Sequence, residues 1–297
     1  MKLKPENISS LQDSLRNAGT PVSDINLSAI NNLIEHSPED MTATVQAGMT
    51  LKNFQVQLAE SKQWLPIDPP FPEGLTVGTL LAENVSGPRR FSYGTIRDWV
   101  IGMSVVLPDG RLIKSGGKVV KNVAGFDLCK LFVGGCSTLG IIVQATFKLL
   151  PVPETEIILE CKCKSLDEIN RLLEIAWNSD LRPCILDVHK PPLTLVAGFA
   201  GPKADVEAQT LIAKRLGFVS ETTTDYDQDF RKNTSMYTSV SPANLIETLR
   251  NIENDAFVAR AGNGVIFHKN AQPRDVQAPA LQKRVKNAFD PKGILTG

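Results

Sequence analysis

The chain has 297 residues, roughly twice the length of a typical domain, so two domains or one large domain are expected. Its 32 lysine and arginine residues balance 32 aspartate and glutamate residues, and a formally neutral chain lacks the positive field that nucleic-acid and membrane-surface proteins use. The 42% of hydrophobic residues suffice for a core, but they stand in interrupted runs that do not predict a membrane-spanning helix. The first residues, MKLKPENISS, contain no apolar signal region, so we expect a cytoplasmic protein. From the charge balance and the interrupted apolar runs, we expect no nucleic-acid partner and no membrane insertion.

The first half of the chain alternates strand-like and helix-like patterns. Residues 9–18 carry apolar side chains at helical spacing, and residues 41–47 alternate like a strand. A helix is expected after Thr50, whose hydroxyl can cap it, and a proline-rich turn follows at residues 67–74. Strands are expected at residues 100–107, 111–115 and 141–150, with a turn at residues 108–110 and a short helix at residues 128–133. Pro151 and Pro153 mark the expected end of this domain.

The second half also mixes helices and strands. Strands are expected at residues 156–163, 185–188, 193–199, 256–261 and 265–267, and helices at residues 165–178, 203–216 and 244–251. Ser165 is the expected N-cap of the first of these helices. Such a pattern with antiparallel turns predicts an α+β domain. We therefore divide the chain into residues 1–152, residues 153–270 and a C-terminal segment, residues 271–297, which is expected to return to the first domain.

Most familiar catalytic motifs are missing. The chain has no P-loop, no GxGxxG fingerprint, no GxSxG elbow and no HExxH sequence. Its five cysteines match no zinc or redox spacing and its three histidines are scattered, so we expect reduced thiols and no metal centre. His268 is expected to end a strand at the surface, and no residue of this chain is nominated as a general base.

Three segments rich in glycine and small polar residues stand out. They are GLTVGT at residues 74–79, NVSGPRR at residues 84–90 and YGTIRD at residues 93–98. Glycine lets a ligand approach main-chain N–H groups, and hydroxyls add donors that suit a pyrophosphate. The alternative is that these segments are ordinary loops. For Arg89, Arg90 and Arg97 we weigh a solvated surface against a subunit interface or a substrate carboxylate.

The order of these segments carries a resemblance to a known family. TATVQAGMTL, the stretch from QWLPIDPP to VVLPDG and the stretch from SGGKVVKNVAGFD to ATFKLLP are similar to the FAD-binding domain of the vanillyl-alcohol oxidase and p-cresol methylhydroxylase (PCMH-type) superfamily. Within it, SGPRR and KNVAGFD most resemble the E-subunit family of bacterial glycolate oxidases, strongly over residues 35–155 and weakly over residues 255–297. The resemblance implies an α+β fold, with a PCMH-type FAD-binding domain of two α+β lobes and a smaller α+β cap domain.

The resemblance also implies which residues would bind FAD. These residues, which would line its pyrophosphate, flavin and adenosine parts, are Pro70, Gly74, Thr76, Val77, Gly78, Asn84, Ser86, Gly87, Gly94, Asn122, Gly140 and Ile142. For Ile142 the alternative is core packing, and for Asn122 it is the shaping of a turn. Asp127 is expected to cap the helix at residues 128–133. No flavin-linking His, Cys or Tyr stands in a matched position, so the FAD would be noncovalent.

One departure from the family pattern bears on FAD binding. The family's loop of arginine and consecutive glycines is missing, because the chain passes from Gly19 to Ser28 without a glycine run. Thr79 stands where many relatives have a second consecutive glycine. The first lobe is thus expected to be shortened, with half of the phosphate-binding backbone absent.

The resemblance implies an FAD-binding subunit of a glycolate oxidase-like 2-hydroxy-acid dehydrogenase, in which the flavin accepts hydride from glycolate or a related 2-hydroxy acid. Its partners would be a D-type flavin subunit, which would carry the catalytic residues, and an iron–sulfur subunit. Two alternatives stay open. A structural subunit that has lost FAD would fill its pocket with side chains, for which Thr79, Glu73 and the short N-terminus are candidates. A stand-alone FAD-dependent alcohol oxidase is disfavoured by the few histidines and the small second domain.

Overall fold

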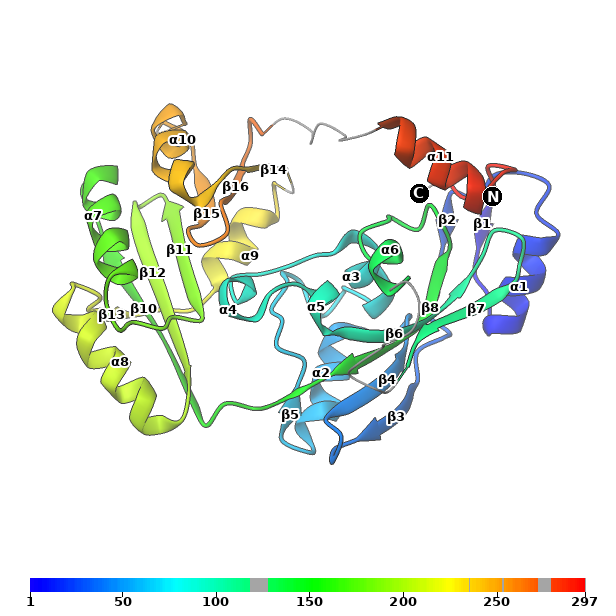
Figure 1. Ribbon diagram of the computed structural model, residues 1–297, viewed down its shortest axis with the longest axis horizontal. Helices are drawn as coiled ribbons and strands as arrows, with labels where there is room; N and C mark the ends of the chain where they lie inside the picture. The colour runs from blue at the N-terminus through cyan, green and yellow to red at the C-terminus, as the bar shows by residue number, and fades with distance from the viewer. Residues whose placement is uncertain (118–127, 235, 253, 272–278, 297) are drawn as a thin grey trace.

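The computed structural model describes residues 1–117, 128–234, 236–252, 254–271 and 279–296. Its elements form two units, each with its own β-sheet and hydrophobic core (Figure 1). The first unit consists of residues 1–117, 128–151 and 279–296, and the second unit consists of the described residues between 155 and 271. The α+β fold class predicted from the sequence is confirmed.

A five-stranded antiparallel sheet forms the centre of the first unit. Across the sheet the strands are β3 (Leu33–Ser37), β4 (Thr42–Gln46), β8 (Ile141–Lys148), β6 (Val100–Val106) and β7 (Leu112–Gly116). One face packs on α2 (Leu51–Ala59), α3 (Val77–Glu83), α5 (Ile96–Trp99) and α6 (Cys129–Phe132). At one end of β6 and β8, the other face packs on α1 (Ile8–Arg16) and on Leu295.

Short elements complete the first unit. Strands β1 (Lys2–Leu3) and β2 (Asp24–Ile25) form a parallel pair, and β5 (Gln63–Trp64) pairs with β9 (Leu150–Pro151). Helix α4 (Arg90–Tyr93) lies next to the second unit, where it contacts strand β11 (Ile185–Lys190). Tyr93 packs against hydrophobic residues of both units, so α4 is part of their interface.

A seven-stranded antiparallel sheet forms the second unit. Across the sheet the strands are β13 (Ser220–Glu221), β10 (Thr155–Lys162), β12 (Thr194–Gly201), β11, β15 (Phe257–Arg260), β16 (Val265–His268) and β14 (Tyr237–Ser239). Helices α7 (Leu166–Trp177), α8 (Lys203–Arg215) and α10 (Leu245–Asn251), the last preceded by a 3₁₀ turn (Pro242–Asn244), cover one face. Helix α9 (Asp225–Arg231) is bound to the opposite face, which turns toward the first unit (Figure 1).

Two of the predicted helix caps, Thr50 and Ser165, are confirmed. The hydroxyls of Thr50 and Ser165 accept the amides of Asn53 and Glu168, each at 3.3 Å, at the starts of α2 and α7. Both side chains satisfy amides that lack a partner within the helix. The expected start and end of α7 differ from its observed bounds by one residue each.

The structure rejects one alternative interpretation, that of residues 74–79 as an ordinary loop, and corrects the expected surface position of His268. The glycine-rich stretch beginning at residue 74 is not loop throughout, because residues 77–83 form α3, whose Val77, Leu80 and Leu81 are fully buried. An apolar face at helical spacing thus prevails over the helix-weakening effect of Gly78. His268 does end a strand, but it is only 6% exposed, because the edge strand β14 covers it and Thr238 Oγ1 lies 2.8 Å from its Nε2.

The C-terminal helix α11 (Pro279–Phe289) packs on the first unit beside the N-terminus (Figure 1). Phe289 meets Phe132 of α6 edge to face, with ring centroids 5.8 Å apart. Lys286 Nζ donates to the carbonyl oxygens of Thr138 and Leu295, both at 2.7 Å. The C-terminal segment is therefore bound to β8 and the loop before it.

Asp290 holds the last residues of the chain. Its carboxylate accepts the amides of Ile294 and Leu295 at 2.8 Å and Lys286 Nζ at 2.6 Å. Ile294 O in turn accepts the amide of Val22 at 2.7 Å. Asp290 thus fixes Leu295 next to residues 22–28.

The substitution Asp290→Asn tests this anchor. Burial acts to raise the pKa of Asp290, but the hydrogen bonds from Lys286 and the two amides outweigh it and hold the pKa below its ordinary value of 3.8. Such a carboxyl stabilises the fold above its unfolded pKa, and that stability is lost as the pH falls through the folded pKa. We expect the variant to lose about 2 kcal/mol of unfolding free energy at neutral pH in urea denaturation.

The loss should shrink at acid pH, where the wild-type carboxyl is also neutral. Asp13→Asn, which removes an exposed ion pair with Arg16, is the matched control and should change stability by less than about 0.5 kcal/mol. A variant at Asp290 with wild-type stability at neutral pH would contradict the anchoring role.

Candidate functional site

A cavity of about 630 Å³ lies in the first unit where three segments meet. Its volume is within the range of roughly 300 to 1,000 Å³ that is typical of ligand sites. The three segments are residues 22–28, the start of α3 and residues 136–142, with the C-terminal Leu295 closing one side. The described lining residues outside residues 22–28 are Thr76, Gly78, Thr79, Ala82, Glu83, Cys136, Ser137, Ile141, Ile142 and Leu295.

Helix α3 forms one wall because it has two different faces. Val77, Leu80 and Leu81 are buried in the core of the first unit. Thr79 and Glu83, four residues apart on the exposed side, both line the cavity. The same amphipathic pattern that anchors the helix therefore turns a hydroxyl and a carboxylate toward the cavity.

The first amides of α3 are already bonded within the protein. Val77 N donates to Met49 O at 2.9 Å, and Gly78 N donates to Ala47 O at 2.8 Å. Thr79 N donates to the hydroxyl of its N-cap, Thr76, at 3.2 Å. A ligand in the cavity would meet side-chain hydroxyls here, and not the main-chain N–H groups that the glycine-rich sequence suggests.

The wall of the cavity combines apolar, hydroxyl and acidic groups. Ile25, Leu27, Ile141, Ile142 and Leu295 are apolar, whereas Ser23, Ser28, Thr76, Thr79 and Ser137 carry hydroxyls. Among the described lining residues the charged side chains are Asp24 and Glu83. Lys2 Nζ lies 3.5 Å from Asp24 Oδ2, and both of these side chains are largely exposed. An anion in the cavity would therefore be opposed by Glu83 more than by Asp24.

Cys136 and Ser137 are held in an unusual backbone conformation. Their φ angles are 47° and 58°, in the left-handed region that side chains other than glycine rarely adopt. Hydrogen bonds from Cys136 N to Ala82 O and from Gly134 N to Leu81 O, both 2.9 Å long, tie this loop to the end of α3. Strained residues of this kind cluster at binding sites. Nothing in the sequence CSTLG indicates this geometry, so the sequence analysis missed Ser137.

Only part of the residue set expected from the sequence reaches this cavity. Thr76, Gly78 and Ile142 line it. Val77 is buried in the core, Pro70 is buried in the proline-rich turn and Gly74 is exposed. Asn122, like the expected cap Asp127, lies outside the described residues.

The other expected residues surround the path from α3 to α4. Asn84 ends α3 in a left-handed conformation, and its Oδ1 is buried without a hydrogen-bond partner. A Cβ at Gly87 would stand 1.8 Å from Asp68 O, so this glycine allows close packing of two chain segments. The remaining expected residues also have structural contacts: Ser86 O accepts Arg231 Nη1, Gly94 ends α4, and Gly140 packs against Val105.

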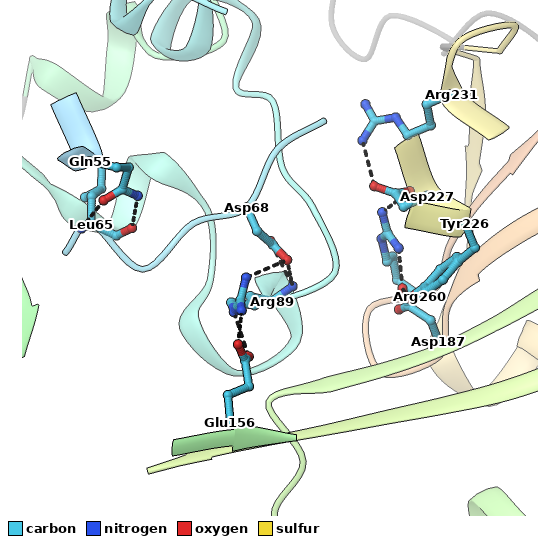
Figure 2. Close-up of polar contacts among 10 residues, drawn as sticks. All are labelled: Gln55, Leu65, Asp68, Arg89, Glu156, Asp187, Tyr226, Asp227, Arg231 and Arg260. Carbon is cyan, nitrogen blue, oxygen red and sulfur yellow. Dashed lines mark hydrogen bonds and ion pairs between the residues drawn. The ribbon is translucent and has the colours of Figure 1, made fainter. Parts of the chain in front are cut away.

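Charged side chains join the two units beside this path (Figure 2). Arg89, just before α4, donates through Nη2 to Glu156 Oε2 of β10 at 2.5 Å. Its Nη1 lies 3.4 Å from Asp68 Oδ2, and its side chain is 16% exposed. The interpretation of Arg89 as a solvated surface residue is therefore wrong, because it bridges the two units.

A second charged group attaches α9 to the sheet of the second unit (Figure 2). Buried Arg260 pairs with Asp187 of β11 and, at 2.5 Å, with Asp227 of α9. Tyr226 donates its hydroxyl to Asp187 Oδ2 at 2.7 Å. Burial raises the pKa of Asp187 to about 6, although Arg260 acts to lower it. From the same helix, Arg231 Nη1 donates to Ser86 O of the first unit at 2.8 Å.

The described residues form neither a candidate metal centre nor a membrane-spanning helix. Among the residues that the structure describes, no group of three or more His, Cys, Asp or Glu side chains could hold a metal ion. In the same described ranges, no helix is both long and apolar enough to cross a membrane.

Comparisons with known proteins agree with the resemblance found in the sequence. Residues 9–116 match the FAD binding domain family. The glycolate oxidase subunit GlcD of Bacillus subtilis is 38% identical over 168 residues, which cover 56% of this chain and 36% of GlcD. The subunit GlcE of Escherichia coli is 32% identical over 143 residues, 48% of this chain and 41% of GlcE. A D-lactate dehydrogenase of Archaeoglobus fulgidus is 37% identical over 145 residues, 48% of this chain and 32% of that enzyme.

The matched region spans less than half the length of each of these relatives. A solved structure of alkyldihydroxyacetonephosphate synthase superposes on 99% of this chain and 75% of its own, with a TM-score of 0.75. At 19% identity this likeness shows a shared fold alone. The chain therefore has the PCMH-type FAD-binding fold, and the domain match and the relatives support its assignment to the PCMH-type FAD-binding superfamily.

Proposed function

We propose that this chain is the FAD-binding subunit of a glycolate oxidase-like complex that oxidises glycolate or a related 2-hydroxy acid. The observation that carries the proposal is the open cavity of about 630 Å³ beside α3. A subunit that had lost its cofactor would be expected to fill such a space with side chains, because an open polar pocket is costly. Of the expected fillers, Thr79 lies in the wall without closing the cavity, and Glu73 is exposed and pairs with Lys52 at 3.4 Å.

The described residues fit FAD with a changed set of donors. Ile141, Ile142 and Leu295 offer an apolar wall that suits an adenine ring, and the hydroxyls of Thr79 and Ser137 can donate to a diphosphate. Asn84, which ends α3, has a buried Oδ1 without a hydrogen-bond partner, but it does not line the cavity and adds no donor or acceptor to its wall. Pro70, Gly74, Val77, Ser86, Gly87, Gly94, Asn122 and Gly140 would shape the rest of the site, as the resemblance implies. FAD itself would supply the hydride acceptor.

The role of this chain would be to hold and position the cofactor. The histidines in the described second unit do not offer a base at this cavity: His189 stacks on Tyr226 with ring centroids 4.6 Å apart, and His268 is bonded to Thr238. We propose that a D-type flavin subunit carries the catalytic residues and that an iron–sulfur subunit removes the electrons. The names of the relatives GlcD and GlcE, each a glycolate oxidase subunit, support a complex of several subunits, and we propose that this complex is cytoplasmic. We also retain the division into residues 1–152, 153–270 and 271–297 as a proposal.

A structural subunit without FAD is the second candidate. It is favoured by the bonded amides of Val77, Gly78 and Thr79, and by the carboxylates of Asp24 and Glu83 in the cavity wall. Both features oppose a diphosphate, which binds best to free amides and cations. The experiments below separate the two candidates.

The proposed activity is tested in the assembled complex. This chain is loaded with FAD before it is assembled with its D-type and iron–sulfur partners, and a parallel complex is assembled without FAD in this chain. The difference between the two spectra is the visible flavin band of this subunit. Addition of glycolate, D-lactate or another 2-hydroxy acid should bleach that band. If the complex turns over at the same rate with and without FAD in this chain, the structural candidate is correct.

The substitution Thr79→Trp tests where FAD binds. Thr79 is exposed and lines the cavity, so an indole at this position should occupy the cavity without displacing core residues. We expect FAD binding to weaken by about tenfold or more, equivalent to about 1.4 kcal/mol, in a titration that follows quenching of FAD fluorescence. Val56→Trp is the matched control, because Val56 is 58% exposed on α2, and it should bind FAD like wild type. Wild-type affinity of the Thr79 variant would place FAD elsewhere.

The substitution Glu83→Gln tests the electrostatics of the same wall. Removing this carboxylate from the wall of a cavity that holds a diphosphate removes a like-charge repulsion, and should strengthen binding by on the order of 1 kcal/mol, or roughly fivefold, at low salt. The gain should decline as salt screens the interaction. Glu60→Gln at the exposed end of α2 serves as the control. An affinity that does not respond to Glu83 would argue against a diphosphate beside α3.

A further inference from the structure

Two carboxylates from different units share one arginine. Asp68 of the first unit and Glu156 of the second both contact Arg89 (Figure 2). The side chains of Asp68, Arg89 and Glu156 are 11%, 16% and 27% exposed. With both carboxylates ionised, the group carries two negative charges and one positive charge largely out of water. Such an arrangement favours the uptake of one proton, because desolvation and mutual repulsion both disfavour the second negative charge.

Asp68 cannot relieve this repulsion by turning to solvent. Its two carboxylate oxygens accept the main-chain amide of Arg89 at 3.0 and 3.1 Å. Its own backbone is packed against Gly87. The Arg89 guanidinium in turn lies over the Trp64 ring, 5.3 Å from its centroid, and Trp64 meets Tyr93 at 5.6 Å. The geometry therefore leaves a change of protonation as the available response.

Besides Arg89, other charged and titratable groups lie close enough to interact electrostatically with Asp68. Arg260 and Asp227 face it from β15 and α9, and Cys184 faces it from the residue before β11. Burial raises the pKa of Asp68 to about 7, against the lowering effects of Arg89 and Arg260. Burial also raises the pKa of Cys184 to about 12 and raises the pKa of Tyr93, so both stay neutral near pH 7. Asp187, which pairs with Arg260, has a pKa of about 6, so Asp68 is the group in this neighbourhood whose pKa lies nearest to 7.

We propose that Asp68 is a proton-controlled latch between the two units. When its carboxyl is neutral, Arg89 pairs with Glu156 undisturbed and holds β10 of the second unit against the segment before α4. When it is ionised, it competes for Arg89 and repels Glu156, so the contact between the units weakens. The latch stands on contacts of this chain alone and does not rest on the proposed function.

The direction of the pH effect follows from linkage. The pKa of Asp68 is higher in the folded protein, at about 7, than the ordinary value of 3.8. The folded protein therefore holds the proton between these values, and the contribution of Asp68 to stability falls as the pH rises across that window. The contact between the units should loosen as the pH passes through about 7.

Tryptophan emission of the full chain reports the latch, because Trp64 lies under Arg89 and Trp177 meets Phe91 across the interface at 5.7 Å. Between about pH 5 and pH 9 we expect the wild-type emission to titrate with a midpoint near 7. Asp68→Asn should abolish this transition. Glu156→Gln should move the midpoint down by about half a unit or more, because Arg89 then pairs with Asp68 alone.

Two control variants identify the titrating group. Asp40→Asn removes an exposed carboxylate at the turn between β3 and β4 and should leave the transition unchanged. His189 stacks on Tyr226, and burial lowers the pKa of this histidine. The substitution His189→Asn should also leave the transition unchanged. A transition that persists in the Asp68 variant or disappears with His189 would overturn the latch. If Asp68→Asn does not fold, an unshifted midpoint in Glu156→Gln overturns it equally.

Hydrogen exchange measures the loosening itself. After correction for the intrinsic effect of pH, amides at residues 86–93 and 155–158 should exchange about threefold faster or more at pH 8 than at pH 6 in wild type, and at equal rates in Asp68→Asn. Equal corrected rates in wild type would mean that the charge on Asp68 does not control the contact.

Discussion

The hydrogen bonds from Val77 N and Gly78 N to the carbonyl oxygens of Met49 and Ala47 are the constraint on which the site depends. They attach the start of α3 to the segment that leaves β4, and the buried Leu80 and Leu81 hold the rest of the helix on the sheet. Because the helix is fixed in this way, Thr79 and Glu83 face the cavity, and the hydroxyls of its wall must replace main-chain amides as donors. The same contact that builds the wall therefore decides its chemistry.

A second set of constraints lies on the other side of α3, where the units meet. The chain from Asn84 to Arg89 is bound by Arg231 and Glu156, both from the second unit. Asn84 also ends the helix whose exposed face lines the cavity. The wall of the cavity and the contact between the units are thus successive parts of one segment. A buried charge that loosens one end of this segment acts close to the residues that the resemblance assigns to the flavin.

The sequence predicts the longer strands of the two sheets and their capped helices because these follow local rules, but it misses β3, β13, β14 and α9. Thr50 and Ser165 are recognisable caps, the alternation that follows Val143 is typical of a strand, and the apolar run around Leu195 is typical of a buried strand. The alternative interpretation of residues 74–79 as an ordinary loop fails at α3, since the apolar spacing of Val77, Leu80 and Leu81 matters more there than Gly78. The positions of Ser137 and Glu156 could not be predicted, because they reach their sites through contacts between residues far apart in the chain.

The absorption spectrum of the purified full chain, as isolated and after addition of FAD followed by removal of the unbound cofactor, tests the central claim most directly. The account predicts flavin bands in the near-ultraviolet and visible range that correspond to about one FAD per chain, held by the hydroxyl-lined cavity beside α3. A colourless chain that retains no added FAD, even with its partner subunits present, would contradict it and would identify the fold as a scaffold without its cofactor.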